Sequence, residues 1–353
     1  MERWTASEAL GVRLKAQQLI AHSARTPQEL VGELAAVQAQ DFYGALWAVG
    51  QRTGSNAVEV GSAFNTGELI RTHLLRPTWH FVAAEDLRWL LLLTGHRVQR
   101  FNGTMYRKLG LEPVHFRRAN KVFERELTGA RALDRTALST ALQRARIDVS
   151  EMRLIHLLMD AELTGLLCSG PRNGKQFTYM LLEERVPKAK AMAKEEALLE
   201  LARRYFRTRG PATLHDFAWW SGLTVSDGKK AMAALGKEFA EVMIDDRAYR
   251  MPREAEPVPL PKHTARLLPN YDEYAIGFKD RRLIHDPSTV ASAPRSTAGS
   301  LRHMMVIDGR VAGTWDSPAN AGDVLVSPFG ALSSPVKKAV NQEIGRYRTF
   351  LGL

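Results

Sequence analysis

Two glutamines separated by one alanine, Gln38 and Gln40, are the residues of this chain whose type and spacing best suit chemistry. A glutamine amide carries a carbonyl acceptor and two N–H donors, so a pair of amides can hold a water molecule and direct dipoles at a developing charge. The competing interpretation is a pair of surface amides at the frayed end of a helix. Spacing alone favours that second interpretation, and the rest of the chain shifts the balance.

The elements around the pair decide how the two amides can point. An apolar run predicts a helix over 27–38, with Thr26 as its N-cap and Pro27 at its first position. Residues two apart on an ideal helix are rotated by about 200°, so the amides converge only if the helix ends there. Asp41 and Gly44, just beyond the pair, favour such an end.

The chain of 353 residues is strongly basic, with 49 Lys and Arg against 38 Asp and Glu, a net charge of +11 and a pI near 9.8. An excess of this size favours a polyanionic partner, and nucleic acid is the commonest one. The single cysteine, Cys168, excludes an intramolecular disulfide and a cysteine-rich zinc site, which fits a reducing cytoplasm. Its apolar neighbours predict a buried, inert thiol.

Several classes of protein lack their signatures here. No charged leader with an apolar core opens the chain, which predicts no secretion signal. The longest apolar run, near 89–94, is too short to span a bilayer. The ten histidines show no HExxH or similar ligand spacing, so we expect neither a metal nor a cofactor.

Helices followed by a short hairpin are predicted three times along the chain. The first hairpin alternates over 69–82, and an Asn-Gly turn within PRNGK marks the second. Helices followed by a two-stranded wing are typical of the winged-helix variant of the helix-turn-helix. The helical patterns cover 6–21, 27–38, 58–64 and 84–108, then 113–127, 136–144 and 151–163, then 194–207, 214–221 and 225–234.

The end of the chain has a different character. A proline-rich stretch predicts a linker over 253–264, followed by β-like runs such as HMMVIDGRVAGTW and a final helix. We therefore expect an α+β fold, mostly α, with three tandem winged-helix motifs and a small C-terminal β-rich domain. The predicted boundaries are 1–110, 111–190 and 191–252 for the three motifs and 253–353 for the linker and last domain.

Basic residues are concentrated in two segments. Residues 97–125 carry eight Lys or Arg against two acids, and residues 185–209 carry eight against three. Each cation that meets a phosphate releases a counterion and adds salt-sensitive affinity. A solvated helix face is the alternative for either segment alone, but both flank winged-helix patterns, which favours contact with DNA.

The predicted DNA contacts come from the first basic segment and from the first hairpin. The two hairpin histidines could touch a base or a phosphate, although such residues more often cap a strand or pack in a polar core. The predicted DNA-binding residues are Arg71, His73, Arg76, His80, Arg117, Arg118 and Lys121.

Two further motifs allow both a functional and a structural interpretation. In DFAWWSGLT, the aromatic side chains of Phe217, Trp219 and Trp220 could hold unstacked bases, although a helix packed by two tryptophans is more often core. In LLPNYDEYAIGFKDR, Asp272 and Glu273 could form a paired-carboxylate glycoside site. The flanking tyrosines equally fit a structural turn, and we favour structure for both motifs.

Together these pieces resemble the AlkZ-type winged-helix DNA glycosylases, a superfamily that also contains the YcaQ (AlkX) branch. The matching pieces are, in order, VQAQDF, LIRTHLLRPTWHFV, DFAWWSGL and LLPNYDEYAIGFKDR, followed by the β-rich end. They are spread over nearly the whole chain. The resemblance implies three tandem winged-helix motifs around a DNA-binding channel, plus a C-terminal β-domain.

The resemblance also implies a role for the glutamines. The AlkZ branch carries Gln-Φ-Gln, with Φ apolar, and this maps onto Gln38, Ala39 and Gln40. The YcaQ branch has Asp at the last position, so this chain resembles the AlkZ side. The implied activity is that of a monofunctional DNA glycosylase acting on N7-alkylated purines, including bulky adducts or interstrand cross-links. The implied partner is double-stranded DNA, preferentially alkylated or cross-linked.

Glutamines suit this chemistry. A purine alkylated at N7 already carries positive charge, so its glycosidic bond breaks without a strong general acid. Hydrolysis passes through an oxocarbenium-like sugar, and the enzyme must add a positioned water and dipoles that stabilise the developing charge. No lysine nucleophile is assigned, so no covalent enzyme–DNA intermediate is expected.

A second class of function stays open at the level of sequence. A non-catalytic winged-helix DNA-binding protein, such as a transcription regulator, would carry the same wings and charge. No effector domain or coiled-coil dimerisation segment is recognisable, which argues against it. We expect a monomer in the cytoplasm, associated with the nucleoid.

Overall fold

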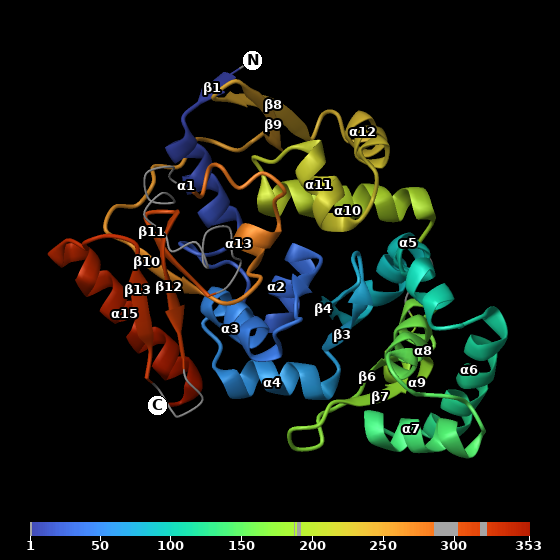
Figure 1. The fold of residues 1–353 in the computed structure, drawn as a ribbon. Coiled ribbons are helices and arrows are strands. Elements are labelled where there is room, and N and C mark those ends of the chain that lie inside the picture. Colours follow the sequence, from blue (N-terminus) through green and yellow to red (C-terminus); the bar gives the residue numbers. More distant parts are fainter. Residues whose placement is uncertain (1, 187, 189–191, 286–302, 318–322) are drawn as a thin grey trace.

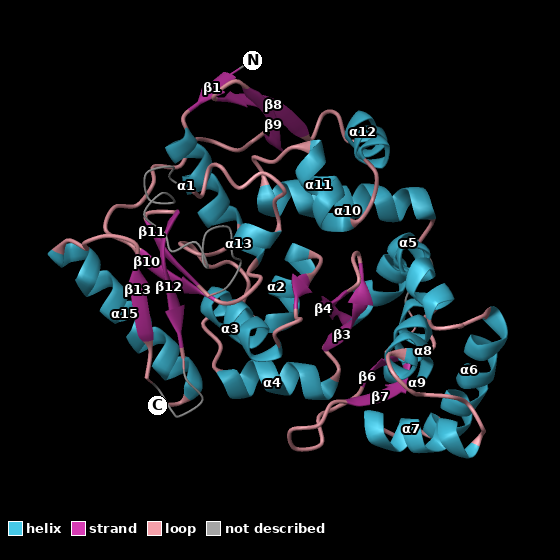
Figure 2. Ribbon diagram, viewed as in Figure 1, coloured by secondary structure: helices cyan, strands magenta, loops and turns pink. Residues whose placement is uncertain are grey.

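A computed structural model describes residues 2–186, 188, 192–285, 303–317 and 323–353 (Figure 1). Helices and small sheets form an α+β fold that is mostly α, which confirms the predicted fold class (Figure 2). In the described part of the chain, the strands form three sheets of three strands and one sheet of four.

One order of elements occurs three times: a helix, a short strand or bridge, two helices and a hairpin. In the first occurrence, the short strand β2 pairs with β4, and β4 pairs with β3, all antiparallel. These elements are α2 (Pro27–Leu34), β2 (Val37–Gln38), α3 (Phe42–Thr53), α4 (Ala57–Thr66), β3 (Leu69–Leu74) and β4 (Thr78–Ala83).

The second occurrence repeats the pairing, with β5 against β7 and β7 against β6. A short 3-10 helix, η1 (Ala84–Asp86), and the long helix α5 (Leu87–Lys108) connect it to the first. Its elements are α6 (Pro113–Leu127), β5 (Leu133–Asp134), α7 (Arg135–Arg144), α8 (Arg153–Leu163), β6 (Leu167–Ser169) and β7 (Thr178–Leu181), followed by α9 (Leu182–Arg185).

In the third occurrence a single bridge between Ala212 and Arg250 replaces the short strand. The N-terminal strand β1 (Glu2–Trp4) adds to this sheet in parallel with β8, and α1 (Ala6–Ala16) packs against α10. The other elements are α10 (Lys194–Arg209), α11 (Leu214–Ser221), α12 (Val225–Ala234), β8 (Phe239–Ile244) and β9 (Arg247–Pro252).

The C-terminal part is a four-stranded antiparallel meander with a long helix against it. Helix α15 packs on both β10 and α3, so this domain is joined to the first winged-helix motif. Its elements are β10 (Ala265–Leu268), α13 (Glu273–Ile276), β11 (Met304–Ile307), β12 (Arg310–Asp316), β13 (Leu325–Pro328) and α15 (Ser334–Leu351).

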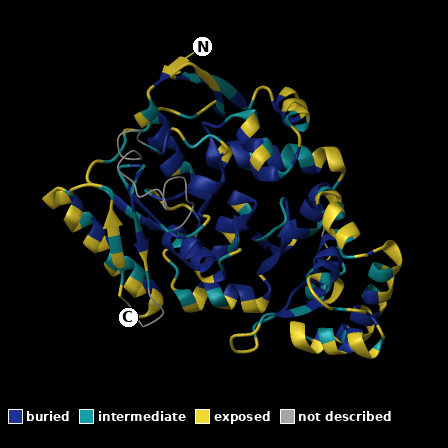
Figure 3. Ribbon diagram, viewed as in Figure 1, coloured by how far each residue is buried: buried dark blue, intermediate teal, exposed yellow. Residues whose placement is uncertain are grey.

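The sheet β2-β4-β3 lies in the interior, between two hydrophobic cores (Figure 3). Ile70 and Val82 pack on one face with α5, α10 and α11. Val37 and Phe81 pack on the other face with α2, α3, α4 and the C-terminal sheet. Alternate residues of a strand point to opposite faces, and burial on both faces fixes the register of this sheet.

Most predicted elements are present, and the predicted bounds of α6, α11 and α12 are the observed ones. The prediction was wrong around the glutamines, where α2 is shorter than expected and helix α3 was not expected at all. The three repeats agree with three tandem winged-helix motifs. The domain boundaries themselves, at 110, 190 and 252, stay a prediction.

Candidate active site

Gln38 ends a short strand and Gln40 lies at a bend just after it, rather than at the end of a helix. Helix α2 ends at Leu34, four residues earlier than predicted, and Ala35 turns the chain with a φ of 62°. Strand β2 then begins at Val37. The strand ends at Gln38, whose side chain is buried, and the chain bends at Gln40, whose side chain is exposed, so a strand and a bend replace the expected frayed helix end.

Asp41 and Gly44 start a helix instead of ending one. The Asp41 carboxylate is the N-cap of α3 and accepts a hydrogen bond of 3.0 Å from the Gly44 N–H. A cap of this kind satisfies one of the free donors in the first turn of a helix. The aromatic pair Phe42-Tyr43 therefore belongs to the first turn of α3, and the glutamines lie between β2 and that helix.

The backbone of the glutamine segment is held at three consecutive polar groups. Glu273 Oε1 accepts from the Gln38 N–H at 2.9 Å, and the Trp79 carbonyl accepts from the Ala39 N–H at 2.8 Å. The Ala39 carbonyl in turn accepts from Arg71 Nε at 3.0 Å. These contacts come from three different elements, so the segment is positioned by the tertiary fold.

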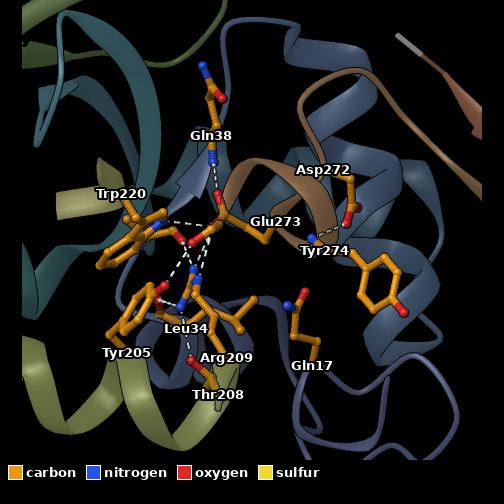
Figure 4. Close-up of polar contacts among 12 residues, drawn as sticks. Gln17, Leu34, Gln38, Tyr205, Thr208, Arg209, Trp220, Asp272, Glu273 and Tyr274 are labelled. Atoms are coloured by element: carbon orange, nitrogen blue, oxygen red, sulfur yellow. Dashed lines mark hydrogen bonds and ion pairs between the residues drawn. The ribbon is translucent and has the colours of Figure 1, made fainter. Parts of the chain in front are cut away.

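Glu273 is itself held by a buried ionic network (Figure 4). Its Oε2 accepts from Arg209 Nη2 at 2.6 Å and from Trp220 Nε1 at 2.8 Å. Arg209 also donates to the carbonyls of Leu34 at 3.0 Å and Ala36 at 3.2 Å. The arginine thus satisfies carbonyls where α2 ends and ties them to the carboxylate that holds Gln38.

The neighbouring carboxylate, Asp272, has a separate arginine. Arg52 donates to both Asp272 oxygens, at 2.7 and 2.8 Å, and both side chains are buried. Asp272 also caps the short helix α13. The structure therefore supports the structural interpretation of Asp272 and Glu273 over a paired-carboxylate glycoside site.

The side chain of Gln38 is buried, with only 6% of the residue exposed. It points away from Glu273 (Figure 4), and its Oε1 is buried with no hydrogen-bond partner among the described residues. The burial of Gln38 argues against the interpretation of both residues as surface amides. Gln40 is exposed, and its Oε1 makes only a long contact of 3.5 Å with the Trp79 N–H.

Two more unsatisfied polar atoms belong to the same row of the sheet. His80 pairs with Gln38 on one side and with Thr72 on the other, so the three side chains share a face. The Thr78 carbonyl lies 2.9 Å from His80 Nδ1, which must therefore carry the proton and donate. His80 Nε2 and Thr72 Oγ1 are buried and have no partner in the described part of the chain.

The charge state of His80 is set by its surroundings. Complete burial lowers its pKa well below the usual value, and the nearby positive charge of Arg76 lowers it further. The imidazole is therefore neutral at pH 7, and its Nε2 is an acceptor. Gln38 Oε1 and His80 Nε2 are thus two acceptors on one sheet face that lack donors.

Three of the predicted DNA-binding residues in the hairpin are buried. Arg71 lies between the rings of Trp79 and Phe177, 4.3 and 4.7 Å from their centroids, and burial lowers its pKa to about 10. His73 is buried, and its Nδ1 contacts the Glu162 carboxylate. Burial of these two residues and of His80 argues against direct contact with DNA, and a DNA-binding role for them stays a prediction.

The predicted residues on α6 are exposed. Arg117 and Lys121 have no hydrogen bond or ion pair with the described residues, whereas Arg118 donates to the carbonyls of Ala145 at 3.2 Å and Arg146 at 3.4 Å. Exposed, unpaired cations are available to phosphates, so the geometry is compatible with the predicted role. Arg76, at the tip of the hairpin, is half-buried.

Half of the eight cations in the second basic segment, over 185–209, are paired with carboxylates within the fold. Arg203 and Arg207 pair with Glu238, Arg204 pairs with Asp86, and Arg209 pairs with Glu273. Our use of this segment as evidence for DNA contact is therefore weakened, because these arginines stabilise the fold. Lys190 lies outside the described residues.

Sequence reasoning missed a group of residues that the C-terminal domain brings to Asp41. Asn270 donates to the Asp41 carboxylate at 3.1 Å, and His303 Nε2 lies 3.7 Å from it. The nearby His303 ring, together with hydrogen bonds from Gly44 and Asn270, lowers the pKa of Asp41. No spacing in the sequence indicates these contacts, because 229 residues separate Asp41 from Asn270.

Other predicted features can be placed as well. Cys168 is fully buried, and burial raises its pKa to about 12, which fits an inert thiol. No cluster of three or more His, Cys, Asp or Glu suited to a metal ion occurs in the described ranges. Across the same ranges, no helix combines the length and apolar character needed to cross a membrane.

Comparison with known proteins shows the family to which this chain belongs. A model of the AlkZ-like DNA glycosylases matches residues 31–350, which is most of the chain. The chain belongs to the AlkZ-like DNA glycosylase family. Membership makes this protein a DNA glycosylase, an enzyme that binds DNA, and it rules against the non-catalytic alternative.

Two relatives of this AlkZ-like glycosylase are informative. The interstrand DNA cross-link repair glycosylase of Streptomyces sahachiroi is 25% identical over 350 residues, which cover 94% of this chain and 92% of the relative. The structure of Streptomyces sahachiroi DNA glycosylase AlkZ superposes with a TM-score of 0.80 at 23% identity, covering 98% of this chain and 97% of that one. The second comparison shows that the two proteins share a fold.

Proposed function

We propose that this DNA glycosylase hydrolyses the N-glycosidic bond of N7-alkylated purines, including bulky adducts and interstrand cross-links, in DNA repair or self-resistance to a genotoxin. The observation that carries the proposal is the unsatisfied carbonyl of Gln38 on a backbone that Glu273, Trp79 and Arg71 hold in place. The curated relative named as a cross-link repair glycosylase supports cross-links as one substrate.

In this proposal the glutamines act through their carbonyl oxygens. A water between Gln38 Oε1 and His80 Nε2 could donate one hydrogen to each, because cross-strand neighbours have Cβ atoms about 5 Å apart. Its oxygen lone pair would then face the sugar. Gln40, which is exposed, would turn its amide dipole toward the same sugar carbon as positive charge develops.

The bonds and charges in this reaction balance without a cofactor. The water oxygen bonds to C1′ while the bond from C1′ to the purine nitrogen breaks. The electron pair of that bond neutralises the alkylated purine, so the leaving base needs no proton. The proton lost by the water passes to a neighbouring acceptor or to solvent, and the products are an abasic site and a free base.

The activity is tested with purified protein and duplex DNA carrying N7-methylguanine or a nitrogen-mustard cross-link. Alkali then cleaves any abasic site that has formed, and we expect product from at least one substrate. Borohydride should trap no covalent enzyme–DNA species, because the mechanism has no amine nucleophile. Product no greater than in buffer for both substrates would refute the proposed specificity.

A monomer in the cytoplasm that associates with the nucleoid is part of the same proposal. The basic, exposed face of α6 supports binding to duplex DNA through phosphates. Preference for alkylated or cross-linked DNA over intact DNA is expected to arise at the glutamines. It is tested by comparing affinities for the damaged and intact forms of one duplex at a fixed salt concentration.

A further inference from the structure

A hollow of about 520 Å³ lies beside the tip of the β3–β4 hairpin, where the hairpin meets α5 and α11. Its lining includes Arg76, Arg97, Arg100 and His96, and no carboxylate of the described residues lines it. A larger hollow of about 1130 Å³ beside β9 and α11 has four carboxylates in its lining. The smaller hollow is therefore distinguished by a purely basic set of ionisable side chains.

Arg76 carries positive charge that the fold leaves uncompensated. Its Nε and Nη2 are buried and have no hydrogen-bond partner among the described residues. Burial lowers its pKa, and the charges of Arg281 and Arg209 lower it further, against an opposing effect of Glu273. Glu273 is already paired with Arg209, so it acts on Arg76 only through its electrostatic field and not through an ion pair. Buried guanidinium N–H groups without an acceptor are costly unless an anion approaches them.

Two partly exposed aromatic side chains line the same hollow, and Arg281 as well as Arg76 lies over the ring of one of them, Trp219. The DFAWWSGLT motif divides in the structure, because Phe217 and Trp220 are fully buried while Trp219 is 41% exposed. Arg76 stacks over the Trp219 ring at 5.4 Å from its centroid. Phe101, also in the lining, is 72% exposed. The core interpretation is thus right for two of the three aromatics and wrong for Trp219.

We propose that this hollow binds one unpaired nucleotide of a DNA strand, with its phosphate against Arg76 and its base stacked on Trp219 or Phe101. Basic grooves with aromatic platforms bind unpaired strands in this way, because every base offers a face for stacking. The volume lies within the range of about 300–1,000 Å³ that is usual for sites that hold small ligands. The inference rests on the proposed function only in taking DNA as the ligand.

The position of the hollow relates it to the glutamines. Arg76 precedes Trp79 by three residues on the hairpin, and the Trp79 carbonyl holds the Ala39 N–H. Three residues span at most about 10 Å, and the turn at the hairpin tip makes the actual distance shorter. A strand whose damaged nucleotide lies at Gln38 and Gln40 could therefore place a nearby nucleotide in the hollow. Damage that disrupts pairing provides such a nucleotide, whereas intact duplex keeps its base faces stacked.

The test measures binding to undamaged DNA, so it does not depend on glycosylase activity. One duplex is fully paired, and the other carries a single extra unpaired 2-aminopurine. The wild-type protein should bind the second duplex about tenfold more tightly, as expected for one base stacked on an aromatic ring. It should also quench the fluorescence of the 2-aminopurine. Equal affinity for the two duplexes would overturn the proposal and would indicate a site for duplex phosphates only.

Variants assign the preference to the hollow. Trp219→Ala and Arg76→Ala should each remove most of the preference, while Trp219→Phe should keep it. Phe101→Ala changes an exposed side chain that is not needed for folding, and it should reduce the preference in part. Lys121→Ala, which removes an exposed, unpaired cation of α6 outside the lining, should weaken binding to both duplexes equally. A preference that survives in Trp219→Ala, Arg76→Ala and Phe101→Ala would refute the site.

Discussion

Two polar clusters meet at Gln38, and they differ in whether their buried atoms have hydrogen-bond partners. On the Glu273 side, the carboxylate oxygens are shared among Arg209, Trp220 and the Gln38 N–H. On the His80 side, Gln38 Oε1 and His80 Nε2 are buried without partners in the part of the chain that the structure describes. Most buried polar atoms in proteins have hydrogen-bond partners. The atoms on the Glu273 side therefore stabilise the fold, whereas those on the His80 side are available to a ligand.

Burying the charges of the cluster around Glu273, the satisfied cluster, costs free energy that only complete pairing offsets. Arg209 and Glu273 are almost fully buried, and each would be strongly destabilising without the other. Their value to the enzyme is placement, because Arg209 binds carbonyls at the end of α2 while Glu273 binds the next segment. The unsatisfied cluster then presents its acceptors from a fixed backbone, which is what a preorganised site requires.

The largest expected effect comes from breaking the satisfied cluster. Glu273→Ala should lower the free energy of unfolding by about 3–5 kcal/mol, because it leaves the Arg209 guanidinium buried and unpaired. Chemical denaturation monitored by circular dichroism measures this change. The matched control is Glu183→Ala, which removes an exposed partner of Arg88 and should cost no more than about 1 kcal/mol. Similar losses in the two variants would contradict the role assigned to the network.

The next effect comes from the unsatisfied cluster and falls on catalysis. Gln38→Met keeps the volume of the buried side chain but removes the carbonyl, so the single-turnover rate should fall by about 10²-fold, as when one preorganised dipole is lost. Stability should change by less than about 1.5 kcal/mol, because the exchange conserves volume and removes an unsatisfied polar atom. Gln40→Ala should slow the reaction similarly and leave stability almost unchanged, because Gln40 is exposed.

These two variants also separate chemistry from binding. Affinity for duplex DNA should hold in both, since it depends mainly on cations that meet phosphates. Wild-type single-turnover rates for both variants on a good substrate would show that the glutamines are not catalytic. A loss of unfolding free energy in Gln38→Met as large as that in Glu273→Ala would show that the two clusters do not differ.

The sequence predicted the repeats well and the neighbourhood of Gln38 poorly, for a physical reason. Caps and turn residues are local signals, and Thr26, Pro27 and the Asn-Gly turn gave the starts of elements correctly. The end of α2 is set by Arg209, which donates to carbonyls 173 and 175 residues away in the chain. Ala35 and Ala36 are good helix formers, so local propensity extended the helix past its true end.

The candidate site divides along the same line. The identity of Gln38 and Gln40 as candidates came from the motif, whereas the burial of Gln38 depends on β2, a strand of two residues that ends before Gln40. The alternation of the hairpin was predicted correctly, and its pairing puts His80 opposite Gln38. Spacing in the sequence could not reveal burial. His80 is buried, whereas the cations of α6 are exposed.

The difference between paired and unpaired groups can also be tested with the cations on the surface. Arg117 and Lys121 lie one turn apart on α6 and are exposed and unpaired, whereas Arg203 and Arg207 on α10 are bound to Glu238. Replacing Arg117 and Lys121 together by Ala should weaken DNA binding about tenfold and lower the slope of log affinity against log salt by about two. A salt series of binding measurements gives both quantities.

The control replaces Arg203 and Arg207 by Ala, which changes the net charge by the same amount. Because those arginines are paired within the fold, the salt slope should stay near that of the wild type, and the loss should appear in stability instead. Equal slopes for the two double variants would mean that net charge, and not the exposed face of α6, determines binding.

The smallest effect concerns the charge of His80. Its pKa is lowered by burial first and then by Arg76, with smaller effects of His73 and Arg209, so the folded protein excludes a proton that the unfolded chain binds below about pH 6.5. The contribution is therefore fully present above that pH and is lost as the pH falls, by about 1 kcal/mol at pH 6. His80→Asn can still donate to the Thr78 carbonyl but does not titrate, so its unfolding free energy should fall less between pH 7.5 and 6.

The other histidines with lowered pKa values, His96, His156 and His285, are present in both proteins and cancel in the difference. Equal pH dependence in the two proteins would mean that His80 takes up a proton as readily in the fold as in the unfolded chain, and burial would then not keep its Nε2 free as an acceptor beside Gln38.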